Sequence, residues 1–198
     1  MKRLCTVVSL TVLVGTLALA SVQPVAAGSC GVWRWPVKTL SDNSRRDIRF
    51  RPLRTSVRRF RARSRPNVRF GRHGPRTGRV EFHTWKLRAR PLQARLEDDG
   101  DIHLVISALK KPAKTMIVEF PDRSCVASAF KRPQIARARR RFLNNCGRVS
   151  ASRWSHLRGF VTIIGVGFWD AIHGQRGVAP NGVELHPVLS FEGTCRPR

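Results

Sequence analysis

Residues 81–106 read EFHTWKLRARPLQARLEDDGDIHLVI, and this stretch decides the fold. Apolar and polar residues alternate on both sides of the turn at 97–101, and the turn contains an Asp-Gly pair. Alternation is typical of a half-buried strand, and Asp-Gly between two such runs indicates a β-hairpin. We therefore expect one strand over 81–96 and a second over 102–109.

The first of these strands changes phase at Arg90-Pro91. Its apolar residues are odd-numbered before that point and even-numbered after it: Trp85, Leu87, Ala89, Leu92, Ala94 and Leu96. One extra residue in a strand produces a bulge, and a bulge bends the strand. A long bent strand can take part in both halves of a small closed sheet.

Three further strands and one helix are expected after the hairpin. The strands are 115–120, 160–170 and 183–192, and the helix begins near Pro133 with an apolar stripe of Ile135, Ala138, Phe142 and Leu143. This order, β-β-β-α-β-β, is the order of the oligonucleotide/oligosaccharide-binding (OB) barrel. The prediction is a mainly β fold, with a five-stranded OB-like barrel and one basic helix over residues 81–198.

The last expected strand has two distinct faces. Four apolar residues should point inward: Val183, Leu185, Leu189 and Phe191. Glu184, His186 and Ser190 should point outward. Pro187 has no amide donor, which places the strand at a ladder edge or a gap between strands.

Residues 1–27 have the layout of a secretory signal peptide. A Lys-Arg start precedes an apolar run, and Val-Ala-Ala at 25–27 is a small-residue cleavage site. We expect cleavage after Ala27 and a bacterial protein that is secreted or held in the cell envelope. The alternatives are a retained membrane helix and a lipid anchor on Cys30.

Four cysteines follow the expected cleavage site: Cys30, Cys125, Cys146 and Cys195. An even number in an exported chain indicates two disulfides. Three connectivities are possible, and we predict Cys125–Cys146 across the helix and Cys30–Cys195 between the ends. A zinc site is the alternative, although no Cys-x-x-Cys spacing supports it.

Residues 28–80 are expected to form a loosely structured basic arm. Positions 34–79 hold fifteen arginines and one lysine against two acids, mixed with Pro, Gly, Ser and isolated Phe. No strand or helix period persists there, so the arm offers little apolar area to offset its ordering entropy. The arm is either a phosphate-binding tail or a solubilising surface enriched in arginine by a GC-rich genome.

A formal net charge of +26 indicates a polyanionic partner, such as a nucleic acid backbone or an anionic envelope polymer. The candidate binding residues are Arg58, Arg59, Arg61, Arg63, Arg137, Arg139, Arg140 and Arg141. No hydrolase, metalloprotease or phosphate-loop motif occurs, so binding without catalysis is the leading interpretation. A structural envelope protein without a specific ligand is a further alternative.

Acids and histidines near the two hairpin loops are the candidates for chemistry. In an OB barrel the loops 97–101 and 170–182 open toward one face. Carboxylates and imidazoles there suit a divalent metal, and the candidate ligands are Asp99, Asp101, Asp170, His173, Glu184 and His186. The alternative is that these acids bond to backbone amides or to arginines. No cofactor is expected for a binding protein.

Most of residues 28–198 resembles an uncharacterised group of secreted bacterial proteins with an OB-like β domain. The matching stretches are WPVKTL at 35–40, LEDDGDIHLV at 96–105, TMIVEFPD at 115–122 and HGQRGVAPNGVELHPVL at 173–189. The resemblance implies secretion and a single small β domain only, because no activity is established for the group. This chain carries far more arginine at 45–79 than the group does.

The hairpin turn Asp99-Gly100-Asp101 is also similar to that of the staphylococcal nuclease family, whose members are OB barrels. The similarity implies a calcium-dependent nuclease or phosphodiesterase with Asp99, Asp101, Asp122 and His173 as catalytic candidates. The family also needs an arginine on the third strand, which reads TMIVEF here.

Overall fold

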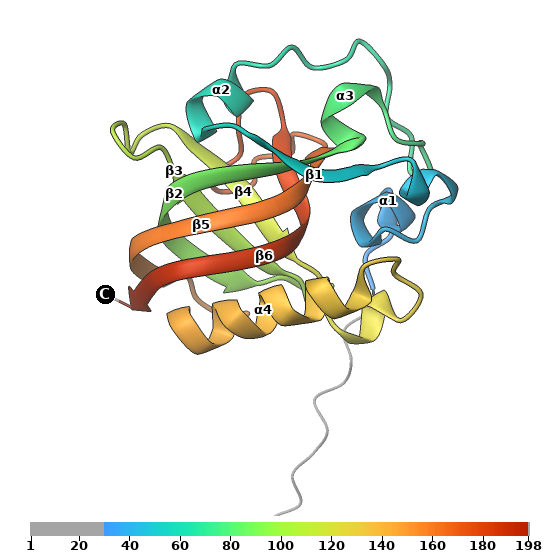
Figure 1. Cartoon of the computed structure of the whole chain (residues 1–198). Coiled ribbons are helices and arrows are strands. Elements are labelled where there is room, and N and C mark those ends of the chain that lie inside the picture. Colours follow the sequence, from blue (N-terminus) through green and yellow to red (C-terminus); the bar gives the residue numbers. More distant parts are fainter. Residues whose placement is uncertain (1–29, 198) are drawn as a thin grey trace, which may run out of the picture.

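The computed structural model describes residues 30–197, and the expected signal peptide at 1–27 lies outside them. The described chain is mainly β, with one six-stranded sheet and a few helices (Figure 1). Its strands are β1 (Arg49–Arg54), β2 (His83–Leu96), β3 (Ile102–Ser107), β4 (Thr115–Phe120), β5 (Ser155–Trp169) and β6 (Val183–Pro197).

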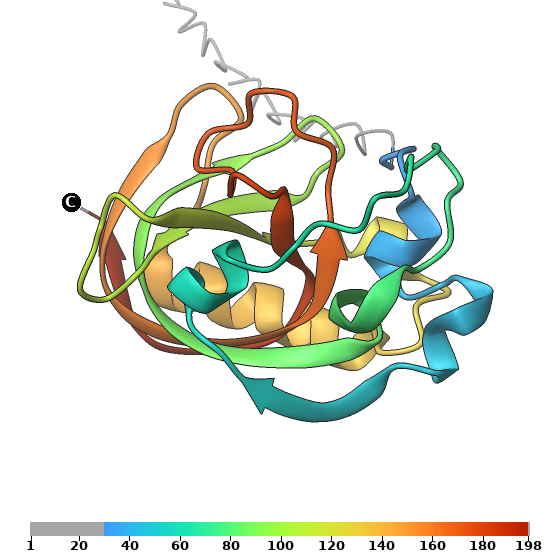
Figure 2. The same ribbon diagram turned by 90° about the horizontal axis from the view of Figure 1, so that it is seen from above.

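The sheet order is β1-β2-β3-β4-β6-β5, and β2 pairs with β5 as well. The pairings therefore run from β2 through β3, β4, β6 and β5 back to β2, and β1 is added on the outside of β2. All these pairs are antiparallel except β4–β6 and β1–β2. Figure 2 shows how strongly the sheet curls.

The hairpin and the bulge expected from the sequence are both present. The register of β2 against β3 shifts between Pro91 and Gln93, and the register of β2 against β5 shifts between Ala89 and Gln93. The shift lies next to the phase change at Arg90-Pro91. Before it β2 pairs mainly with β5, and after it with β3, so the bend lets one strand serve both partners.

Helix α4 (Arg132–Cys146) packs against β6 with the apolar stripe expected from the sequence. Pro133 lies in its first turn, and Gly147 caps it with φ of 86°, a conformation that favours glycine. Ile135, Ala138 and Phe142 are buried. The ring of Phe142 contacts those of Phe120 and Phe191 at centroid distances of 5.0 and 5.5 Å.

The expectation of a loosely structured arm is wrong for residues 30–62. This segment forms α1 (Trp35–Thr39), a 3₁₀ turn η1 (Asn43–Arg46), β1 and α2 (Val57–Arg61), and α3 (Gly78–Glu81) precedes β2. Val57 and Phe60 are buried in the main core, and Leu40 and Ile48 belong to a second apolar cluster with Ile135. Single apolar residues spaced along an arginine-rich stretch thus anchor it without a local period.

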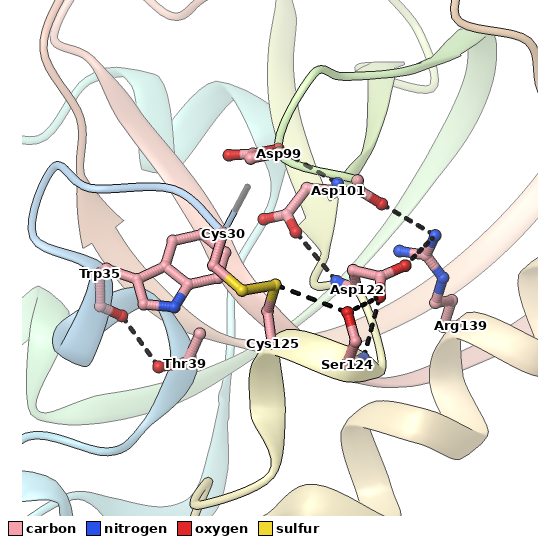
Figure 3. Close-up of a disulfide and its surroundings, with 10 residues drawn as sticks. Cys30, Trp35, Thr39, Asp99, Asp101, Asp122, Ser124, Cys125 and Arg139 are labelled. Atoms are coloured by element: carbon pink, nitrogen blue, oxygen red, sulfur yellow. Dashed lines mark hydrogen bonds and ion pairs between the residues drawn. A yellow bond between two sulfur atoms is a disulfide. The ribbon is translucent and has the colours of Figure 1, made fainter. Parts of the chain in front are cut away.

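The predicted disulfide pairing is wrong. Cys30 bonds to Cys125 within a second 3₁₀ turn, η2 (Ser124–Val126), and Cys146 at the end of α4 bonds to Cys195 on β6. Helix α4 ends at Cys146 beside Cys195 of β6, so Cys125 is left to pair with Cys30 (Figure 3). Two disulfides are typical of an oxidising compartment.

The face assignment along β6 is correct at its start and wrong at Leu189. Val183 and Leu185 are in the main core, but Val188 replaces Leu189 there, and Leu189 packs on the second cluster. The reason is a register shift, because Ile164 pairs with Ser190 and Gly165 with Val188. Pro187 lies just beyond the β4–β6 ladder, where no amide donor is needed.

No helix within residues 30–197 is long and apolar enough to span a bilayer.

Candidate functional site

A cavity of about 540 Å³ lies where the β2–β3 turn and the β5–β6 loop meet the N-terminal segment, residues 30–38. Its walls come from residues 30–38, from the β2–β3 turn and from the β5–β6 loop. Its floor is the outer face of β3 and β4, where the buried residues His103, Ile117 and Glu119 line it. Gly177 allows the β5–β6 loop to approach closely, because a Cβ there would lie 2.4 Å from Val105.

Acidic side chains gather at this cavity, although the chain as a whole is strongly basic. Seven of its twelve acids line the cavity or lie directly behind the floor: Glu97, Asp98, Asp99, Asp101, Glu119, Asp170 and Glu184. Lys38, Arg95 and Arg176 are the cations that line it. Concentrating acids at one place costs repulsion, and the structure offsets that repulsion by pairing Glu119 with Lys38, His103 and His186.

Glu119 is the centre of the charge network on the floor. Its carboxylate lies 3.2 Å from Nδ1 of His103, 2.9 Å from Nδ1 of His186 and 3.6 Å from Nζ of Lys38. Burial alone would raise the pKa of Glu119, but the Lys38 ammonium and the two imidazoles outweigh it and hold the pKa well below its usual range. Glu119 is therefore an ionised carboxylate, and only its edge reaches the cavity.

His186 lies behind Glu119, between three carboxylates. Its Nε2 is 3.2 Å from Oδ2 of Asp101, and its Nδ1 is 3.3 Å from Oε1 of Glu184. Burial and Lys38 lower the pKa of His186, but the carboxylates outweigh them and hold it well above its usual value. The sequence placed His186 and Glu184 on the outward face, but both side chains are buried.

Two other acids of the site hold protons more tightly than usual. Burial raises the pKa of Asp99 to about 6, and the nearby Asp101 carboxylate adds to the shift. Burial raises the pKa of Glu184 to about 7, together with the charges of Asp170 and Glu119. The site thus contains carboxyl groups of different proton affinity within one small volume.

Three tryptophans line the cavity, and the sequence analysis did not find them. Trp33 and Trp35 come from the N-terminal segment, and Trp154 precedes β5. The Trp154 ring meets His103 edge-on at 5.3 Å, and the Arg176 guanidinium lies 5.2 Å from it. These rings come from segments that lie outside the sheet strands and line the cavity together with His103, Ile117 and Glu119 of β3 and β4.

The four nuclease candidates do not meet at one point. Asp99 lines the cavity, Asp101 is buried behind it, and His173 is exposed at the rim. Asp122 turns to the other side, where it accepts bonds from Ser124 and pairs with Arg139 at 3.3 Å (Figure 3). Burial opposes the shift, but the Ser124 bonds and Arg139 lower the pKa of Asp122.

Of the six metal candidates, Asp101, Glu184 and His186 come together in the buried cluster. Asp99 lines the cavity, and Asp170 lines it as well, where its carboxylate accepts a bond from Gln175. Glu119, which the sequence analysis did not select, completes the cluster. A hint was its place in TMIVEF, where an acid interrupts an apolar strand.

The predicted arginines fall into two groups at opposite ends of the curled sheet, because α2 lies at one end and α4 at the other (Figures 1 and 2). On the α2 side Arg58 and Arg59 are exposed. Arg61 donates to the Thr115 carbonyl, and the guanidinium of Arg63 lies 4.3 Å from the Trp85 ring centroid. The guanidinium groups of Arg61 and Arg63 therefore already make contacts within the protein.

On α4, Arg137, Arg140 and Arg141 are exposed, and Arg141 pairs with Glu192 at 3.3 Å. Arg139 is buried and donates to the carbonyls of Phe120 and Gly100 at 2.7 and 2.8 Å. Its guanidinium links α4 to the β2–β3 turn, so Arg139 is not part of an exposed binding surface.

Comparison with known protein families, with curated proteins and with solved structures finds no match for this chain.

Proposed function

We propose that the protein is an exported, non-catalytic polyanion-binding protein built on an OB-like barrel. In this proposal the ligand is a nucleic acid backbone or an anionic envelope polymer. The contact surface is the arginine stripe, defined as Arg49, Arg51, Arg54, Arg58 and Arg59 on β1 and α2.

The strand pairings support the OB-like barrel. The strands pair in the ring β2-β3-β4-β6-β5-β2, in which β4 and β6 are parallel. Along the chain, α4 lies between β4 and β5. A five-stranded Greek-key barrel of this chain order is the OB fold. The acidic cavity lies between the two hairpin loops that frame the ligand face of such barrels.

The observation that carries the binding proposal is the arginine stripe itself. All five arginines are exposed, and within residues 30–197 none of them forms an ion pair. Arg54, Arg58 and Arg59 surround a hollow of about 570 Å³. Convergent guanidinium groups without acidic partners suit phosphate, sulfate or carboxylate groups, to which they can donate two bonds each.

The usual ligand face of the barrel is a poor place for a polyanion here. Five carboxylates line the cavity against three basic side chains, and an ionised Glu119 forms part of its floor. Phosphate groups would meet like charge there. The arginine stripe, where we propose that the ligand binds, and the acidic cavity are therefore separate parts of the surface.

Removing Arg54, Arg58 and Arg59 together should weaken polyanion binding selectively. We expect the Arg→Gln triple variant to bind duplex DNA and heparin at least tenfold more weakly at about 100 mM salt. The slope of log K against log salt for DNA should fall by about 2–3, since each phosphate contact contributes about 0.9. Fluorescence anisotropy over a salt series measures both quantities.

The matched control is Arg137→Gln, Arg140→Gln and Arg141→Gln, which removes the same charge at the other end of the sheet. It should change the affinity by no more than about threefold. Equal losses in both variants would mean that binding follows net charge alone. Failure of the unaltered protein to bind either polymer at about 50 mM salt would refute the proposal.

A further inference from the structure

The buried cluster below the acidic cavity has the chemistry of a metal site. Asp101, Glu119 and His186 each bring one ligand atom within 4.8 Å of those of the other two. The exposed fractions of Asp101 and His186 are 1 % and 0 %, so both side chains are sealed from bulk solvent. Glu119 connects the cluster to the cavity, which gives an ion a way in.

Two atoms of the cluster have no hydrogen-bond partner in the described part of the chain. They are Oδ2 of Asp101 and Nε2 of His186. The two atoms lie 3.2 Å apart, but the oxygen is off the line along which the ring nitrogen bonds. Buried polar atoms are rarely left without a partner, so this pair needs an explanation.

A shared ion explains the spacing of these atoms. Ligand atoms about 2.1 Å from one ion lie about 3.0 Å apart in octahedral and about 3.4 Å apart in tetrahedral coordination. The observed 3.2 Å falls between these values. An oxygen that is off-axis for a hydrogen bond is well placed as the neighbouring ligand of an ion on the nitrogen.

The surroundings hold the two ligands in place. Nδ1 of His186 is hydrogen-bonded to Oε1 of Glu184 at 3.3 Å and lies 2.9 Å from Oε2 of Glu119, so Nε2 is the ring nitrogen that faces Asp101. The other oxygen of Asp101 accepts from the Asp122 amide at 2.9 Å, which fixes the carboxylate (Figure 3). Such outer bonds to a histidine and a carboxylate are typical of metal centres.

We propose that Asp101, Glu119 and His186 bind one divalent first-row transition metal ion, of the Zn²⁺ or Mn²⁺ type. The imidazole ligand favours these ions over Ca²⁺ and Mg²⁺, which prefer oxygen ligands alone. Three carboxyl groups, from Asp101, Glu119 and Glu184, lie 3.2, 2.9 and 3.3 Å from the ring nitrogens of His186, and carboxylate oxygens beside an imidazole suit such a cation.

The test is calorimetric titration of the disulfide-intact protein with Zn²⁺, Mn²⁺ and Ca²⁺. We expect one Zn²⁺ or Mn²⁺ per chain and much weaker Ca²⁺ binding. Asp101→Asn and His186→Gln should each weaken binding by more than tenfold. The matched controls Asp98→Asn and His173→Gln, at the exposed rim of the cavity, should bind as the unaltered protein does.

A measurement on the unaltered protein covers the case in which the buried variants fold poorly. Substoichiometric Mn²⁺ should broaden the amide signals of Asp101, Glu119 and His186 first in ¹⁵N-resolved NMR spectra. Broadening confined to rim residues such as Asp98 would overturn the proposal. So would absence of saturable Zn²⁺ and Mn²⁺ binding up to about 1 mM, a preference for Ca²⁺, or unchanged binding in folded Asp101→Asn.

Discussion

Replacing Arg34 with alanine should destabilise the protein by about 3–5 kcal/mol, because it leaves a buried carboxylate without its counter-ion. The guanidinium of Arg34 and the carboxylate of Glu81 are both fully buried, and they form two parallel bonds of 2.7 Å. Arg34 also donates to the carbonyls of Gly74, Pro75 and Trp169. One side chain thus joins the N-terminal segment, the loop before α3 and the end of β5.

Urea denaturation followed by tryptophan fluorescence measures this loss. Arg141→Ala is the control, because the ion pair of Arg141 with Glu192 is exposed, and its removal should cost less than about 1 kcal/mol. The double variant Arg34→Met, Glu81→Leu should recover part of the stability, since it leaves no unpaired charge. If Arg34→Ala lowers the free energy of unfolding by less than about 1 kcal/mol, the buried carboxylate of Glu81 does not need Arg34 as its counter-ion.

Removing the Cys30–Cys125 disulfide should cost about 2–4 kcal/mol and should open the acidic cavity. The bond links residues 95 apart in the chain, so it restricts the unfolded state strongly. It also holds Cys30, Gly31 and Trp33 in the cavity wall. The variant is Cys30→Ser, Cys125→Ser.

Hydrogen exchange distinguishes this effect from a general loss of stability. Amides of residues 31–40 should lose protection well before those of β3 and β4. The control Cys146→Ser, Cys195→Ser breaks the bond between α4 and β6, and it should leave 31–40 protected relative to the rest. Equal protection of 31–40 in both variants would contradict the role assigned to Cys30 and Cys125.

The elements that could be predicted from the sequence are those with a strong local pattern. The alternation around Asp99-Gly100 gave the hairpin, and the slip at Arg90-Pro91 gave the bulge. Pro133 and Gly147 bracket α4 because a helix start tolerates the missing amide hydrogen and a helix end favours a positive φ. Each signal acts over a few residues, so no distant contact is needed to read it.

The remaining features depend on contacts between distant segments. Val57 and Phe60 have no periodic neighbours, so their burial could not be seen before the segment was placed on the sheet. The disulfide pairing followed from the direction of α4. Glu184 and His186 alternate as outward residues should, but both are buried once the other segments fold around the sheet.

We propose that polyanions bind the arginine stripe on β1 and α2 and do not contact the acidic cavity. Titration of ¹⁵N-labelled protein with a short DNA duplex at about 20 mM salt tests this claim directly. We expect saturable shifts at residues 49–59, without shifts at His103, Glu119 or Trp154. Shifts centred on the cavity, or no shifts at all, would contradict it.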